Sequence, residues 1–138
     1  MTLSPRLLAV VDALPLAPGM RVLEIGCGPG AAAREVAKRV GPTGHVLAVD
    51  RSAKAIAQTV AGSPAELAAG TLSVRQSTVE DLTLEENEPL YDLAFAVRVG
   101  ALDGRHPHLE QQALHRIAAA LTPAGRLFID SREIALPR

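Results

Sequence analysis

The sequence is poor in cysteine and in aromatic residues, and both shortages limit what the protein can be. Cys27 is its only cysteine, so no disulfide can form within the chain, and we expect a reducing, cytoplasmic environment. Tryptophan is absent, and the aromatic residues are Tyr91, Phe95 and Phe128. With so few rings to stack on bases and a formal net charge of -1, nucleic acid is not expected as a partner.

Long hydrophobic runs are missing as well. No stretch approaches the ~20 consecutive apolar residues that span a bilayer. The apolar run at 7–11 is ended by Asp12 and is too short for the core of a signal peptide, so no membrane association is expected. With 48% hydrophobic and 21% charged residues, the composition is that of a globular protein. Its 138 residues are enough for a single domain over 1–138.

Apolar segments alternate with helical segments along the chain. The segments that read as strands are 20–25, 45–49, 72–76, 90–97 and 126–130. The expected helices cover 5–14, 31–40, 53–61 and the segment with Leu109, Ala113, Ile117 and Leu121 on one face. Apolar strands separated by helices are typical of a parallel sheet covered on both faces. The pattern therefore predicts an α/β fold, a Rossmann-like doubly wound parallel sheet in the order 3-2-1-4-5.

A glycine-rich turn follows the first expected strand. The turn covers 26–30, contains Gly26, Gly28 and Gly30, and reads VLEIGCGPG at 22–30 together with the end of the strand. Glycines let the backbone turn sharply into the next helix and let a ligand approach closely. Asp50 ends the neighbouring strand, where a carboxylate can accept hydrogen bonds from both hydroxyls of a ribose. The turn and Asp50 together predict a site for a ribose-containing cofactor.

Charge separates two possible cofactors for this turn. Gly26, Gly28 and Ala31 satisfy the loose fingerprint of dinucleotide-binding proteins. Glu24, however, would repel a pyrophosphate by about 4 kcal/mol at about 4 Å and an effective dielectric near 20. Pro29 removes one N–H that could hold a phosphate. S-adenosylmethionine carries an ammonium and a sulfonium instead of phosphates, so the charge pattern favours it.

The motifs resemble those of class I S-adenosylmethionine-dependent methyltransferases, especially the small-molecule branch with ubiquinone-biosynthesis-type enzymes. The resemblance rests on VLEIGCGPG at 22–30, HVLAVDRS at 45–52, YDLAFA at 91–96 and LTPAGRLFI at 121–129. It implies methyl transfer to a small-molecule acceptor, with S-adenosylhomocysteine as the product. The cofactor-binding residues that it implies are Glu24, Gly26, Cys27, Gly28, Gly30, Asp50, Arg51, Thr78, Val79 and Ala96.

Within that set the resemblance implies separate roles. Glu24 and the loop from Gly26 to Gly30 would hold the methionine part, and Asp50 the ribose. Arg51 would lie beside the adenine. Thr78 stands where the family has an acidic residue for the adenine amine, and its hydroxyl is a weaker acceptor than a carboxylate.

Other residues leave alternatives open. Cys27 is expected to be a small residue in a tight turn rather than a nucleophile, because no activating histidine is nearby in sequence. One of Asp103, His106 or His108 could be a general base, or all could belong to a solvated loop. The three histidines at 106, 108 and 115 lack the spacing of a metal site, so no metal is expected.

The C-terminal segment leads to a prediction about assembly. The resemblance implies an antiparallel hairpin of strands six and seven, for which few residues follow 126–130. The residues after 130 could form at most one short strand, which would leave an apolar edge of the fifth strand without full pairing. We expect a homodimer, or association with another chain, through that edge. The alternative is a monomer whose C-terminal segment folds back over the edge. Two alternatives to an independent methyltransferase stay open: a cofactor-binding module completed by a partner chain, and an NAD-dependent oxidoreductase.

Overall fold

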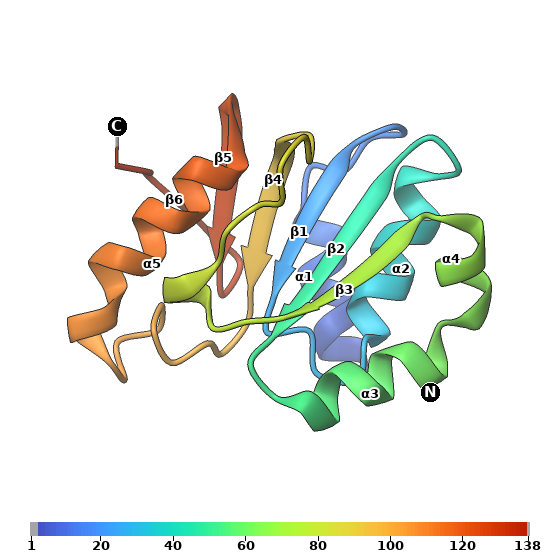
Figure 1. Ribbon diagram of the computed structural model, residues 1–138, viewed down its shortest axis with the longest axis horizontal. Coiled ribbons are helices and arrows are strands. Elements are labelled where there is room, and N and C mark those ends of the chain that lie inside the picture. The colour runs from blue at the N-terminus through green and yellow to red at the C-terminus, as the bar shows by residue number, and fades with distance from the viewer. Residues whose placement is uncertain (1–2, 138) are drawn as a thin grey trace.

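The computed structural model describes residues 3–137 and contains a six-stranded sheet (Figure 1). The strands are β1 (Arg21–Ile25), β2 (His45–Asp50), β3 (Leu72–Gln76), β4 (Tyr91–Ala96), β5 (Leu121–Ile129) and β6 (Arg132–Ile134). The helices are α1 (Pro5–Ala13), α2 (Ala31–Val40), α3 (Ala53–Gly62), α4 (Pro64–Ala69), the 3₁₀ turn η1 (Val79–Asp81) and α5 (Pro107–Ala120). The strand order is β3-β2-β1-β4-β5-β6, which confirms the predicted order of the first five strands.

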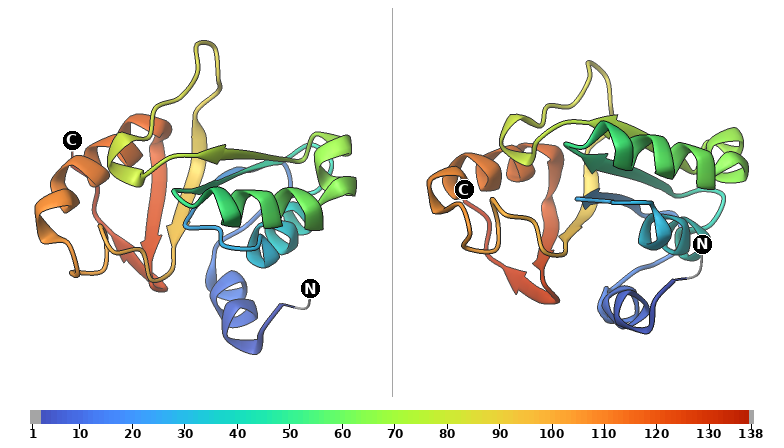
Figure 2. Two further views of the ribbon diagram at one scale, coloured as in Figure 1. Left: turned by 60° about the horizontal axis from the view of Figure 1, so that its bottom comes forward. Right: turned by 90° about the horizontal axis from the view of Figure 1, so that it is seen from below.

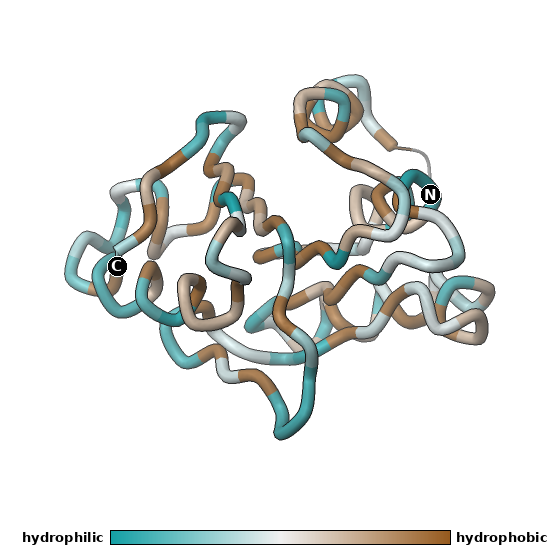
Figure 3. The backbone as a smooth tube through the Cα atoms, turned by 90° about the horizontal axis from the view of Figure 1, so that it is seen from above, coloured by the Kyte–Doolittle hydropathy of each residue, from teal (hydrophilic) through white to brown (hydrophobic). Residues whose placement is uncertain are grey.

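The sheet divides the hydrophobic core into two layers. Alternate residues of a strand point to opposite faces, so Leu23 and Ile25 of β1 pack on the side of α5, with Ile117. Val22 points to the other side, where it packs with Val36 of α2. Figure 2 shows α1 and α2 on that side, and the tube in Figure 3 is hydrophilic at the tips of several outer loops. By the same alternation Glu24 lies on the α2 side, beneath the glycine-rich turn.

The carboxyl ends of the five parallel strands all lie on the same side of the molecule, toward the bottom of Figure 1. Local sequence sets the helices that return the chain. Ser4 caps α1 with Pro5 at its first position, and Ser52 caps α3 by accepting a hydrogen bond from the N–H of Ala55 at 3.2 Å. No helix within 3–137 is both long and apolar enough to cross a membrane.

The fifth strand differs from the prediction. It begins directly after α5 at Leu121 rather than at Arg126, with an irregularity in its pairing opposite Tyr91 to Leu93. Its outer edge is also paired: β6 runs antiparallel to it, with Leu127 opposite Ile134. The tight turn between them places Asp130 and Ser131 at φ of 48° and 69°, as in type I′ hairpins.

This pairing removes the premise of the homodimer prediction. The premise of an unpaired edge is wrong for 127–129, because three residue pairs join β5 to β6 of the same chain. Arg126 and Glu133 add an exposed ion pair across the hairpin at 2.7 Å. The oligomeric state itself stays a prediction.

Candidate functional site

A cavity of about 340 Å³ lies at the carboxyl ends of the parallel strands. It is formed by the turn after β1, the end of β2, the segment after β3 and the long connection between β4 and α5. Its lining residues are Ile25, Gly26, Gly28, Val49, Asp50, Arg51, Ser77, Thr78, Val79, Glu80, Val97, Arg98, Val99, Gly100, Ala101, Arg105, His106 and Leu109. This is the position at which open α/β sheets bind their ligands.

Six of the ten predicted cofactor-binding residues line this cavity, and four do not. Those that line it are Gly26, Gly28, Asp50, Arg51, Thr78 and Val79. Glu24, Cys27, Gly30 and Ala96 are not among its lining residues. Glu24 is a residue of β1 and lies beneath the glycine-rich turn. Cys27 and Gly30 belong to the turn itself, and Ala96 is buried at the end of β4.

The glycine-rich turn needs its glycines for conformation and for space. Gly26, Gly28 and Gly30 have φ of 77°, 54° and 90°, which side chains disfavour. A Cβ on Gly26 would lie 2.8 Å from Cγ2 of Val99 in the β4–α5 connection. The N–H groups of Gly26 and Cys27 both donate to the Val49 carbonyl, at 2.7 and 3.0 Å, so the turn is fastened to the end of β2.

Asp50 is held in place by two backbone donors. Its Oδ2 accepts a hydrogen bond from the N–H of Gly28 at 3.0 Å, and its Oδ1 accepts one from the N–H of Ser52 at 2.9 Å. Each carboxylate oxygen can accept a further bond. The carboxylate therefore stands oriented at the cavity wall with acceptor capacity left for a ligand's hydroxyl groups.

Glu24 is the most unusual group at the site. It is 5% exposed, and its Oε1 is the one buried side-chain polar atom among the described residues that has no hydrogen-bond partner. Burial, followed by repulsion from Asp50, raises the pKa of Glu24 from 4.5 to about 8, while Arg34 acts in the opposite direction. A buried acceptor without a partner is costly, so it marks a place where a bound donor would be favoured.

Cys27 belongs to the turn, and its side chain is buried beneath it. Its Sγ lies 3.6 Å from the hydroxyl of Thr59, and burial raises the pKa of the thiol to about 11. A thiol with that pKa is protonated at neutral pH and a poor nucleophile. The environment therefore favours the structural interpretation of Cys27.

The segment after β3 supplies Thr78 and Val79. The N–H of Ser77 donates to the Asp50 carbonyl at 3.0 Å, which brings this segment beside the end of β2. The Thr78 hydroxyl donates to Oδ2 of Asp81 at 3.2 Å, and Val79 is buried against the core. The main chain of Arg51 accepts a hydrogen bond from the Gln76 side chain at 3.2 Å.

The connection between β4 and α5 contains residues that sequence reasoning missed. Arg98 has a φ of 56°, and its backbone is held on both sides. Its N–H donates to Oδ1 of Asp130 at 2.8 Å, and its carbonyl accepts from Nη2 of Arg105 at 2.7 Å. A non-glycine residue in this conformation costs free energy and persists only where its surroundings fix it. The sequence signal was the length of this connection, since functional loops of doubly wound sheets follow the strand ends.

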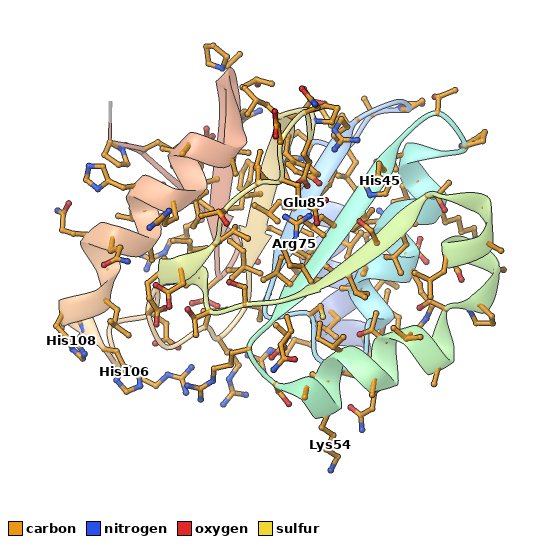
Figure 4. The ribbon with its side chains drawn as sticks, in the orientation of Figure 1. His45, Lys54, Arg75, Glu85, His106 and His108 are labelled. Carbon is orange, nitrogen blue, oxygen red and sulfur yellow. The ribbon has the colours of Figure 1, made fainter. Side chains whose placement is uncertain are left out.

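Of the three residues considered as a general base, His106 alone lines the cavity. The Asp103 carboxylate is paired with Arg105 at 2.9 Å, and this pairing lowers its pKa. Figure 4 shows His106 and His108 together at the start of α5, while His45, Arg75 and Glu85 lie toward the opposite end of the strands. Within residues 3–137, no three His, Cys, Asp or Glu side chains are grouped to hold a metal ion.

Comparison with known proteins identifies the family. Residues 22–125 match the family model described as a methyltransferase domain. The chain is 36% identical over 122 residues to nocamycin O-methyltransferase of Saccharothrix syringae, which covers 88% of this chain and 40% of that protein. The relative is thus much longer than this chain.

Two solved structures share the fold. A SAM-dependent methyltransferase from Aquifex aeolicus superposes with a TM-score of 0.72 at 22% identity, over 89% of this chain and 62% of that one. Coclaurine N-methyltransferase, solved with N-methylheliamine and SAH, gives a TM-score of 0.71 at 21% identity, over 89% of this chain and 34% of that one.

The strand order, the glycine-rich turn and the acid at the end of β2 define a Rossmann-like cofactor-binding domain. Within that class, the chain belongs to the methyltransferase-domain family.

Proposed function

We propose that the chain binds S-adenosylmethionine in the cavity beside the glycine-rich turn and transfers its methyl group to a small acceptor. The observation that carries the proposal is the buried, unpartnered Oε1 of Glu24 beneath that turn. An ammonium group of the cofactor, directly or through water, would supply the missing donor and favour the ionised carboxylate. A pyrophosphate at the same place has no donor to offer Oε1, and its negative charge would oppose ionisation of the carboxyl.

The other residues fit the remaining parts of the cofactor. Asp50 has free acceptor capacity for the ribose hydroxyls. Arg51, Thr78 and Val79 line the side of the cavity that would receive the adenine. When bound, the cofactor supplies a sulfonium methyl group that is already activated for transfer, so the protein's part is to position the acceptor and exclude water.

The acceptor side of the cavity supports an acceptor with an acidic group. The β4–α5 connection contributes Arg98, Arg105 and His106 to the lining. The charge of Arg105 is offset by its ion pair with Asp103 of the same connection, so Arg98 is the main source of positive charge. Cations at the rim attract an anionic acceptor, and a carboxylate or phenolate oxygen needs no further base to accept a methyl group. The name of the similar nocamycin enzyme also points to transfer onto oxygen.

Isothermal titration calorimetry with S-adenosylhomocysteine, S-adenosylmethionine and NADH tests the cofactor. We expect saturable binding of the first two and none of NADH. Tight NADH binding with no response to S-adenosylhomocysteine would replace the proposal with the oxidoreductase alternative.

A methyl-transfer assay then tests the reaction. The acceptors are small carboxylic acids and phenols, each paired with its uncharged amide or ether, and release of S-adenosylhomocysteine is the readout. Cofactor binding without turnover on any of them would favour the alternative of a binding module completed by a partner chain.

A further inference from the structure

Two buried hydroxyl groups outside the cavity support the glycine-rich turn, Thr59 directly and Ser63 through the side chain of Arg34. Apart from Glu24, the buried polar side chains of residues 3–137 are Thr59 and Ser63, each 0% exposed. Thr59 lies near the end of α3 and Ser63 directly after that helix. Buried hydroxyls are usually hydrogen-bonded. The Thr59 hydroxyl bonds to the turn, and the Ser63 hydroxyl bonds to Arg34, which itself bonds to the turn.

Thr59 holds the main chain of Gly28 by a hydrogen bond. Its Oγ1 donates to the Gly28 carbonyl at 2.8 Å, while the N–H of Gly28 donates to Asp50 at 3.0 Å. The main-chain polar groups of Gly28 are thus both engaged by side chains that come from later in the sequence. A Cβ on Gly30 would lie 2.8 Å from Cγ2 of Thr59, so the methyl group packs closely on the end of the turn.

Arg34 fixes the next residue of the turn. Its Nη1 donates to the Pro29 carbonyl at 3.1 Å and to Oγ of Ser63 at 3.0 Å. Gly62 makes room for the guanidinium, because a Cβ there would lie 2.9 Å from Nη1. Pro29 has no N–H of its own, so its carbonyl is the one main-chain group through which this residue can be held by a hydrogen bond.

These contacts connect the turn to the ribose-binding acid through one helix. The N-terminal cap of α3, Ser52, donates its N–H to Asp50, and the end of the same helix holds the Gly28 carbonyl. A helix is stiff along its axis, so it holds Asp50 and the turn at a fixed separation.

We propose that Thr59, with Arg34 and Ser63, is a positioning residue that holds the glycine-rich turn in its cofactor-binding conformation. The inference rests on the proposed function, because it assigns these residues to the same cofactor site. None of the three lines the cavity, and Thr59 acts through Gly28. Fixing the turn before the ligand arrives reduces the conformational freedom lost on binding, which raises affinity.

The test compares Thr59→Val with Thr59→Ser. Valine keeps nearly the shape of threonine but cannot donate, and serine keeps the hydroxyl. We expect Thr59→Val to weaken S-adenosylhomocysteine binding about tenfold, and Thr59→Ser to stay within about threefold of the wild type. Thr71→Val is the matched control, since the Thr71 hydroxyl donates to the Glu66 carbonyl at 3.4 Å, away from the cavity.

Amide hydrogen exchange separates positioning from general stability. Thr59→Val should speed exchange at Gly28 and Gly30 in the ligand-free protein, while amides of β4 keep their protection. If Thr59→Val impairs folding, Ser63→Ala takes its place, with an expected loss of about threefold because Arg34 can still reach Pro29.

The outcomes are distinct. Failure of the wild type to bind S-adenosylhomocysteine rejects the proposed function. Wild-type binding that is unchanged in folded Thr59→Val, or weakened equally by Thr71→Val, overturns the positioning role alone.

Discussion

Replacement of Glu24 by glutamine is expected to change stability and cofactor affinity in opposite directions. In the ligand-free protein Glu24 is 5% exposed, and burial raises the pKa of its carboxyl to about 8. Because the folded pKa lies above the unfolded value of 4.5, the contribution of Glu24 to stability is intact below pH 4.5 and is lost as pH rises through 8. A glutamine does not titrate and escapes this loss.

The size of this stability difference follows from the folded and unfolded pKa values of Glu24. Near pH 7 the folded protein must keep protonated a carboxyl that is ionised when unfolded, which costs on the order of 3 kcal/mol at 1.36 kcal/mol per pH unit. Glu24→Gln should therefore be more stable than the wild type by up to about that amount at pH 7, and equally stable near pH 4. The difference between the two proteins isolates Glu24, since all other groups titrate in both.

The affinity for the cofactor should fall in Glu24→Gln, although its stability rises. The glutamine cannot form an ion pair with an ammonium group, so we expect S-adenosylhomocysteine to bind roughly 10- to 100-fold more weakly to Glu24→Gln. Wild-type affinity should also rise between pH 6 and pH 8 as the carboxyl ionises, whereas the affinity of the variant stays flat over that range.

Urea denaturation at pH 4, 7 and 8.5 and titration calorimetry measure the two effects. Glu86→Gln, at an exposed position, is the control and should change neither. An equal stability gain at all three pH values, or unchanged affinity in Glu24→Gln, would refute the role assigned to the buried carboxylate.

Three further predictions concern the cofactor site and assembly. Asp50→Ala should weaken S-adenosylhomocysteine binding roughly 10- to 150-fold by calorimetry, because hydrogen bonds to a charged acceptor are lost, and an unchanged Kd would count against the ribose role. Thr78→Asp, made together with Asp81→Asn to remove the neighbouring charge, should keep or improve affinity relative to Asp81→Asn alone; a several-fold loss with the fold intact would show that Thr78 is not in the adenine slot. Sedimentation equilibrium at micromolar concentration tests the predicted homodimer, which now depends on the short edge of β6, and a clean monomer of 14.4 kDa rejects it.

The parts of the fold that the sequence predicts well are those with a local signal. Apolar runs such as 45–49 place the strands, and right-handed crossovers then order the sheet. The glycine-rich turn and Asp50 were predictable as neighbours because parallel strands end at a common edge, and the 3.0 Å bond from Gly28 to Asp50 joins them. The branch within the methyltransferase family stays a prediction.

The parts that were not predicted depend on contacts between distant residues. Thr59 and Ser63 have no unusual neighbours in sequence, yet their partners Gly28 and Arg34 lie 31 and 29 positions away. Arg98 is placed by Asp130 from the far end of the chain. The β5–β6 hairpin was expected only as an alternative, because Asp130 and Ser131 form its turn without the asparagine and glycine that usually signal one.

A crystal structure of the complex with S-adenosylhomocysteine tests the central claim most directly. We predict ligand density in the cavity, with the ribose hydroxyls bonded to Asp50 and the amino group within reach of Glu24 Oε1, directly or through one water. Density away from the glycine-rich turn and Asp50, or no binding at saturating ligand, would contradict the account.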